Sequence, residues 1–173
     1  MHKSVMEWVA KVAPKKTEGL SVLEFGARNV NGTPRQFFEG SEYVGLDILD
    51  GDGVDVLLDA TEAGEAFAGS ADVVISTEML EHAEDWRGAV DAMKACLKPD
   101  GKLILTTRGP GFGRHEYPGD YWRFTVSDMQ AIFADMGCRV ISDPQHPGVF
   151  VYAWKLAKER EPVDLSQIEV AEI

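Results

Sequence analysis

Apolar residues recur along the chain in two alternating patterns. Short apolar runs, most of them bounded by glycine or ended by an acidic residue, are typical of strands buried inside a parallel sheet. They predict strands over residues 21–25, 42–47, 54–59, 71–76, 102–107, 139–142 and 149–154. Between these runs, apolar residues spaced by three or four positions predict helices over residues 5–13, 34–39, 62–67, 85–98 and 126–136. Strands that alternate with helices in this way indicate a doubly wound α/β sheet.

One domain accounts for almost the whole chain. The sequence has 173 residues, of which 45% are hydrophobic and 27% are charged, as is ordinary for a globular protein with one core. We expect residues 1–157 to form this domain. Residues 158–173 are acidic with scattered apolar positions, and we expect them to form a loosely ordered tail.

The loop after the first predicted strand is the first candidate for ligand binding. This strand carries Glu24 near its end, and Gly26 and Gly32 mark the polar loop that follows. Ligands of open α/β sheets bind at this carboxyl edge of the strands. A dinucleotide-binding fingerprint would need glycine where Arg28 and Asn31 stand. The loop therefore disfavours a nicotinamide-dinucleotide enzyme.

A helix is expected to begin directly after this loop. Thr33 is a good helix cap, Pro34 suits the first helical position, and Gln36 stands where it can complete a capping box with Thr33. The free N–H groups of such a helix would face the crevice at the edge of the sheet.

The same loop resembles the first motif of the class I S-adenosylmethionine-dependent methyltransferases, in which an apolar strand and an acid precede Gly-x-Gly-x-Gly. Glu24, Gly26 and Gly32 match the acid and two of the glycines, whereas Arg28 departs from the remaining glycine. Within the class the chain is most similar to the small type 11 methyltransferases. The turns that carry this likeness are Ser-Thr-Glu-Met-Leu-Glu-His at 76–82 and Leu-Lys-Pro-Asp-Gly at 97–101. The resemblance implies a seven-stranded, mostly parallel, Rossmann-like sheet whose last strand runs antiparallel.

The resemblance also implies S-adenosyl-L-methionine as cofactor, with S-adenosyl-L-homocysteine as product. Asp47 ends the second strand and can accept hydrogen bonds from both ribose hydroxyls, with a role in the turn as the alternative. Asp59 matches an acid near the adenine amino group, or else caps the next helix. Glu24 lies near the methionine amino group in the family, or anchors the loop; Arg28 either reaches the cofactor's carboxylate or faces solvent. The predicted cofactor-binding residues are Glu24, Gly26, Ala27, Asn31, Gly32, Asp47, Ile48, Asp59, Ala60, Thr77, Glu78 and Met79.

Residues 109–124 form a glycine- and aromatic-rich segment that is too long for a simple connection. Because the segment follows the fifth strand at the same edge of the sheet, we expect a lid over the substrate, with a packed surface loop as the alternative. The predicted catalytic residues are His115, as a general base, and Tyr117. The predicted substrate-binding residues are Tyr121, Trp122 and Arg123. Arg123 would clamp an acidic group, or else hold the root of the lid.

Charge and composition exclude several other classes of protein. A formal net charge of -12 disfavours nucleic-acid binding, which needs a basic surface. No apolar run approaches the roughly 20 residues of a membrane span, and the amphipathic start of the chain does not resemble a signal peptide. We therefore expect a cytoplasmic protein in which Cys96 and Cys138 are reduced. The four histidines are scattered in the sequence, so we expect no metal site and a structural role for His82.

Two functions remain open at this point. The first is methyl transfer from S-adenosylmethionine to a small-molecule or carbohydrate-like acceptor, a reaction that depends mainly on holding the acceptor in line with an already activated methyl group. The alternative is a non-catalytic protein that keeps the fold and binds a nucleoside or a partner. The acids at 24, 47 and 59 favour the enzyme.

Overall fold

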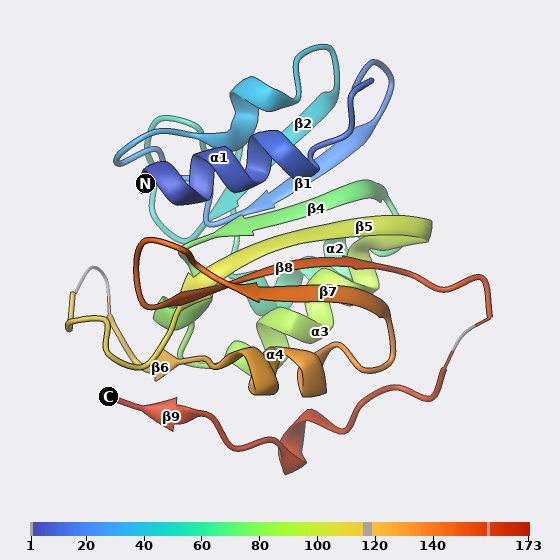
Figure 1. Ribbon diagram of the computed structural model, residues 1–173. Coiled ribbons are helices and arrows are strands. Elements are labelled where there is room, and N and C mark those ends of the chain that lie inside the picture. The colour runs from blue at the N-terminus through green and yellow to red at the C-terminus, as the bar shows by residue number, and fades with distance from the viewer. Residues whose placement is uncertain (1, 116–118, 159) are drawn as a thin grey trace.

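A seven-stranded sheet forms the centre of the computed structural model, which describes residues 2–115, 119–158 and 160–173 (Figure 1). The strands of this sheet are β1 (Ser21–Phe25), β2 (Glu42–Asp47), β3 (Val56–Leu57), β4 (Ala71–Thr77), β5 (Leu97–Arg108), β7 (Gly137–Ser142) and β8 (Gly148–Trp154). A separate small sheet contains β6 (Trp122–Arg123) and β9 (Ala171–Glu172). The α-helices are α1 (Lys3–Val12), α2 (Ala63–Ala66), α3 (Trp86–Cys96) and α4 (Val126–Ile132). The short 3-10 helices are η1 (Pro34–Phe37), η2 (Ala60–Glu62), η3 (Leu80–His82) and η4 (Leu165–Gln167).

The strand order is β3-β2-β1-β4-β5-β8-β7. Strands β1 to β5 pair in parallel, whereas β8 is antiparallel to both β5 and β7. This order confirms the predicted doubly wound sheet and its antiparallel last strand. The carboxyl ends of β1, β2 and β4 consequently meet at one edge, at the position where the chain reverses direction across the sheet.

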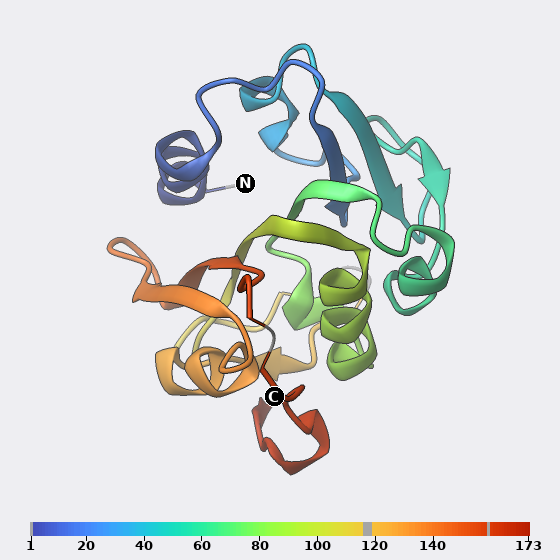
Figure 2. The same cartoon turned by 90° about the vertical axis from the view of Figure 1, so that its right-hand side faces the viewer.

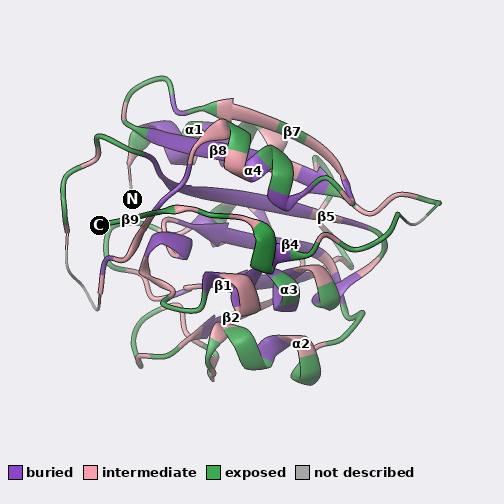
Figure 3. Cartoon of the chain, turned by 90° about the horizontal axis from the view of Figure 1, so that it is seen from below, coloured by how far each residue is buried: buried purple, intermediate pink, exposed green. Residues whose placement is uncertain are grey.

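Helices cover both faces of the sheet, but unequally (Figures 1 and 2). Helix α1 and η1 lie over one face, where Trp8 of α1 stacks on Phe150 of β8. Helices α2, α3 and α4 cover the other face, and the larger cluster of buried side chains lies beneath them. The central strands β4 and β5 are the most deeply buried part of the sheet (Figure 3). Apolar burial on both sides is what their unbroken hydrophobic runs predict.

The helix expected after the first strand is largely absent. In its place η1 makes only a short 3-10 turn, in which the Thr33 hydroxyl accepts a hydrogen bond from the Arg35 backbone N–H. Gln36 donates its side-chain amide to the Thr33 carbonyl, so the predicted capping box does not form. Arg35 instead donates to the Tyr43 carbonyl on β2 and pairs with Asp55, which directly precedes β3. The crevice therefore has no helix N-terminus from this segment, and the prediction was wrong on this point.

The C-terminal segment, whose composition predicts loose order, packs along the outside of α3 and α4. Arg87 of α3 donates hydrogen bonds to the carbonyls of Leu165 and Ile168, at 2.9 and 2.7 Å, and Leu165 is buried. Strand β9 then pairs with β6. Scattered apolar residues in this acidic stretch thus have specific partners that its composition does not reveal.

Across the described residues, none of the helices has both the length and the apolar character needed to cross a membrane. Cys96 and Cys138 are both free thiols, in agreement with the expectation that they form no disulfide.

Candidate active site

A cavity of about 800 Å³ opens at the carboxyl edge of β1, β2 and β4. Its volume lies in the range of pockets that hold one small organic ligand. All of the predicted cofactor-binding residues line this cavity, together with His115 and Tyr121 from the predicted lid. The cavity walls also include Arg28, for which a contact to the cofactor was one of two alternatives, and residues that the sequence did not single out as cofactor ligands, among them His82 and Arg108.

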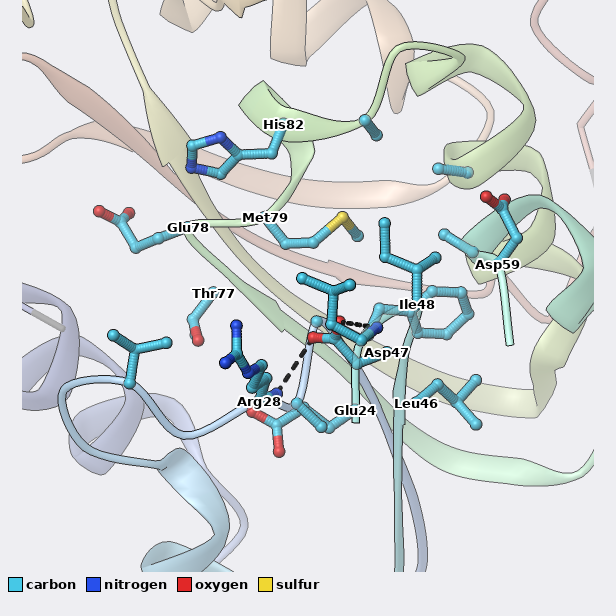
Figure 4. A pocket seen from close by; sticks show the side chains of 18 of the residues that line it. Glu24, Arg28, Leu46, Asp47, Ile48, Asp59, Thr77, Glu78, Met79 and His82 are labelled. Atoms are coloured by element: carbon cyan, nitrogen blue, oxygen red, sulfur yellow. Dashed lines mark hydrogen bonds between the residues drawn. The ribbon is translucent and has the colours of Figure 1, made fainter. Parts of the chain in front are cut away.

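Asp47 is held by the backbone on both sides of its carboxylate. Its Oδ2 accepts from the Arg28 N–H at 3.1 Å, and its Oδ1 accepts from the Leu49 N–H at 2.9 Å (Figure 4). The first bond ties the end of β2 to the loop after β1. Each carboxylate oxygen can accept a second hydrogen bond, so the group is oriented and still able to receive two more donors. Both roles considered for Asp47, the turn and the ligand contact, are compatible with this geometry.

Apolar side chains form a slot beside Asp47. Ile48 is 55% exposed and projects into the cavity on the same side as Met79 (Figure 4). Gly26 packs directly against Met79, since a Cβ at position 26 would lie 2.5 Å from the Met79 Cγ, and Gly26 also has a φ of +76°. Any larger residue at position 26 would displace Met79 and adopt a strained backbone conformation, so glycine is required here. Asp59, at the far end, uses Oδ1 to cap η2 through the Thr61 N–H at 2.8 Å, which is the capping role considered for it.

Glu24 is a buried carboxyl group with a neutral partner. Its side chain is buried at the end of β1, and its Oε2 accepts a hydrogen bond from the Tyr43 hydroxyl at 2.8 Å. Burial raises the pKa of Glu24 to about 7, although the bond from Tyr43 and the charge of Arg35 both oppose this shift. The side chain that holds Glu24 therefore belongs to β2 and not to the loop after β1.

Arg28 lines the cavity and is half-buried, a position compatible with a contact to the cofactor's carboxylate. Gly51 allows this placement, because a Cβ there would lie 3.0 Å from the Arg28 Cγ. The absence of a side chain at position 51 leaves room for the Arg28 side chain beside the loop that follows β2.

The turn after β4 carries backbone strain. Glu78 has a φ of +56°, a conformation that costs a non-glycine residue roughly 1–2 kcal/mol. Contacts to β5 hold it there: its N–H donates to the Thr106 carbonyl, its Oε1 accepts from the Thr106 hydroxyl at 3.0 Å, and its carboxylate pairs with Arg108. Burial lowers the pKa of Arg108 to about 10. Strain maintained by several contacts is common at functional turns.

Those residues of segment 109–124 that were predicted to act on the substrate, and that the structure describes, divide into two groups. His115 and Tyr121 reach the cavity. Arg123 is buried and forms a forked pair with Asp120, with Nη1 and Nη2 at 2.5 and 2.7 Å from the two carboxylate oxygens. It also donates to the carbonyls of Phe112 and Gly113, so it holds the root of the segment and does not clamp a substrate.

Trp122 is likewise structural, because its indole N–H donates to the Ala83 carbonyl at 3.0 Å and its side chain packs on the main core. The prediction that Trp122 and Arg123 contact substrate is not supported by these positions. The predicted catalytic residue Tyr117 lies outside the described residues.

The fold brings together two histidines and an acid that are scattered in the sequence. Glu81 and His82 follow β4, and His115 follows β5; the His82 and His115 rings lie 4.7 Å apart. The parallel pairing of β4 with β5 explains this proximity, since segments that follow neighbouring parallel strands leave the same edge. Both segments follow strands that the sequence predicts, but the cluster could have been found only once the order of those strands in the sheet was known.

Comparison with known proteins identifies the class of protein. Residues 1–142 match the family model Methyltransf_23, which is described as a methyltransferase domain. A search of curated proteins finds no match. Among solved structures, the Aquifex aeolicus S-adenosylmethionine-dependent methyltransferase is similar at 16% identity and a TM-score of 0.64, covering 87% of this chain and 89% of that one.

Two further solved structures were determined with ligands. The Burkholderia thailandensis 1,6-didemethyltoxoflavin-N1-methyltransferase, with 1,6-didemethyltoxoflavin and S-adenosylhomocysteine bound, is 15% identical with a TM-score of 0.65, covering 87% of this chain and 78% of that one. The Haemonchus contortus phosphoethanolamine N-methyltransferase 2, in complex with phosphomonomethylethanolamine and S-adenosylhomocysteine, is 16% identical with a TM-score of 0.67. In that case 87% of this chain is covered, but only 52% of the other.

The family match covers well over half of the chain, so the protein belongs to the methyltransferase domain family. It is a class I S-adenosylmethionine-dependent methyltransferase, as its fold and sequence motif predicted. The cavity residues fit this cofactor. An oriented carboxylate with free acceptor capacity suits a ribose diol, and the Ile48–Met79 slot suits an adenine ring.

Proposed function

We propose that this chain transfers a methyl group from S-adenosylmethionine to a small-molecule acceptor, carbohydrate-like in its polarity, within the cytoplasm. The observation that carries the proposal is the pairing of an oriented Asp47 with an apolar slot in a cavity sized for small ligands. The net charge of -12 argues against a nucleic-acid acceptor.

In this proposal the nucleoside occupies the end of the cavity near β2. Asp47 accepts hydrogen bonds from the ribose hydroxyls, and Ile48 and Met79 enclose the adenine. Asp59 retains one carboxylate oxygen for the exocyclic amino group, because its other oxygen caps η2. Glu24 and Arg28 flank the site of the amino-acid part and supply opposite charges for its ammonium and carboxylate groups.

The acceptor occupies the opposite end, between the turn at Glu78 and the segment 109–124, which acts as a lid. The cofactor supplies an activated methyl sulfonium, so the protein has to align the acceptor and exclude water. Tyr121 forms part of this wall. His115 lies at the acceptor end and is one candidate for acting on the acceptor proton; Tyr117 is the other.

Calorimetry with S-adenosylhomocysteine tests the cofactor half of the proposal. We expect saturable binding to the purified chain, and no binding of NADH. Asp47→Ala should weaken binding by roughly 1.5–3 kcal/mol, about ten- to a hundredfold, because two charge-assisted hydrogen bonds are lost.

Asp50→Ala is the matched control, since Asp50 is an exposed carboxylate three positions along the same loop. Its affinity for S-adenosylhomocysteine should equal that of the wild type. An unchanged dissociation constant in Asp47→Ala would remove this residue from the site, and failure of the wild type to bind the nucleoside would contradict the proposed function itself.

A further inference from the structure

Glu81, His82 and His115 direct three ligand atoms at one point. The Glu81 Oε1 lies 3.9 Å from the His82 Nε2 and 3.9 Å from the His115 Nε2. All three atoms lie within 4.8 Å of one another. Both distances are too long for hydrogen bonds, so direct bonding between these side chains does not explain the arrangement.

Each histidine has an oxygen acceptor at its other ring nitrogen. The His82 Nδ1 contacts the Gly119 carbonyl oxygen, which fixes a proton on Nδ1 and leaves the Nε2 lone pair free. The His115 Nδ1 lies 3.2 Å from the Asp120 Oδ2, and Asp120 is itself held by Arg123. Carboxylate and carbonyl partners of this kind orient metal-binding histidines and fix their tautomers.

Glu81 provides the independent sign that something is bound here. Its side chain is fully buried, and its Oε2 accepts a hydrogen bond from the Thr107 hydroxyl at 2.8 Å. Its Oε1 is buried too, yet has no hydrogen-bond partner among the described residues. A buried carboxylate oxygen without a donor is costly, and a cation beside it would remove that cost.

We propose that Glu81, His82 and His115 form a binding site for a divalent transition-metal ion. Two imidazole nitrogens and one carboxylate oxygen are a ligand set that Zn²⁺ and its neighbours in the first row accept. Ligand atoms about 2.0–2.2 Å from one ion lie roughly 3.3 Å apart, so binding requires only a small inward movement of the two imidazoles. Three protein ligands leave an open coordination position, and His82 and His115 both line the cavity.

The metal site adds a way of activating the acceptor to the proposed methyl transfer. It rests on the proposed function in one respect, the nature of the acceptor. A hydroxyl oxygen of the acceptor, bound at the open position, would have a lowered pKa and would release its proton to solvent before the lid excludes water. That oxygen then forms a bond to the methyl carbon, while the bond from the methyl carbon to sulfur breaks. The electron pair of the broken bond stays on sulfur, which becomes the thioether of S-adenosylhomocysteine. His115 holds the ion in this scheme and is not a free base.

Metal binding is tested on the full chain after treatment with a chelator. Calorimetric titration with Zn²⁺ should show one ion bound per chain, and Co²⁺ should give the visible absorption bands of a site with nitrogen and oxygen ligands. His115→Ala should weaken Zn²⁺ binding by at least roughly tenfold; this imidazole is partly exposed, so the variant is expected to fold. Glu81→Gln should weaken binding as well.

His146→Ala is the matched control. His146 contacts the ring of His2 and takes no part in the cluster, so this variant should bind Zn²⁺ as the wild type does. Equal Zn²⁺ affinity in His115→Ala, Glu81→Gln and wild type would overturn the inference, as would the absence of saturable binding to the wild type.

Binding of S-adenosylhomocysteine, measured on the same samples, separates this inference from the proposed function. A chain that binds the nucleoside but not Zn²⁺ overturns the metal site and leaves the proposed function standing. A chain that binds Zn²⁺ through the cluster but not the nucleoside supports the metal site and contradicts the proposed function.

Discussion

The two ends of the cavity are built in different ways. At the nucleoside end, Glu24, Asp47 and Gly26 stand at or next to the ends of paired parallel strands, and their positions follow from the register of β1 with β2. At the acceptor end, His115 stands on a long segment that is held in place by side-chain contacts, above all the buried pair of Asp120 with Arg123. Backbone pairing fixes the first end, and a few polar side chains fix the second.

This difference teaches that the two ends should respond separately to mutation. Loss of a strand-end side chain removes a ligand contact and leaves the sheet as it is. Loss of a side chain that holds the segment 109–124 disturbs the acceptor end as a whole, and costs stability as well, because buried charges lose their partners.

Arg123→Ala should have the largest effect. Arg123 is 4% exposed and its guanidinium pairs with Asp120, so its removal leaves a buried carboxylate without its charged partner. We expect a loss of about 3–5 kcal/mol in the free energy of unfolding, measured with urea. Where the variant is still folded, its affinity for S-adenosylhomocysteine should stay within a few-fold of the wild type.

Two further variants sharpen this result. Arg139→Ala removes an exposed arginine on β7 and should change stability by no more than about 0.5 kcal/mol. Arg123→Lys keeps the charge but not the forked geometry. Its loss in the free energy of unfolding should lie between those of Arg123→Ala and Arg139→Ala. If Arg123→Ala were as stable as Arg139→Ala, the acceptor end would not depend on this pair.

The same difference decides what could be predicted from the sequence. Residues 21–25 and 71–77 form buried parallel strands, which appear as unbroken apolar runs, so the sheet and the strand-end residue Asp47 could be predicted. The helix expected at 34–39 fails because Arg35 bonds to Tyr43 on β2 and to Asp55 before β3, partners that a short helix does not provide.

Long-range contacts between side chains have no such local pattern. The spacing of Asp120 and Arg123 is equally compatible with a substrate clamp and with a buried pair, and only the fold shows that the pair forms. The approach of His115 to Glu81 depends on which strands are neighbours in the sheet. Among the described residues predicted for the acceptor end, His115 and Tyr121 line the cavity, whereas Trp122 and Arg123 pack elsewhere, and their roles toward a substrate stay predictions.

Glu24→Gln should have the next largest effect, and one that depends on pH. The pKa of Glu24 is about 7 in the folded chain, above its ordinary value of 4.5, so the unfolded chain releases this proton first as the pH rises. Stability of the wild type should fall, relative to the variant, between about pH 4.5 and pH 7, by up to about 3 kcal/mol. The difference should then stay constant at higher pH.

Urea unfolding of both proteins at pH 5 and pH 8 measures this effect. Tyr43→Phe is the companion variant, because it removes the hydrogen bond that favours the ionised carboxylate. The window in which stability falls should extend to higher pH in that variant. Parallel pH profiles of Glu24→Gln and wild type would show that burial does not raise the pKa of Glu24 in the folded chain.

Ile48→Ala should have the smallest effect, and it isolates ligand contact from folding. Ile48 is 55% exposed, so its truncation should change the free energy of unfolding by no more than about 0.5 kcal/mol. Because an adenine ring in the slot would cover this side chain, affinity for S-adenosylhomocysteine should fall by about 1 kcal/mol, roughly fivefold. Leu57→Ala is the matched control, since Leu57 is 59% exposed on the adjacent strand and does not line the cavity. Equal affinities in the two variants would mean that the adenine lies elsewhere, and that the nucleoside end is defined by Asp47 without the apolar slot.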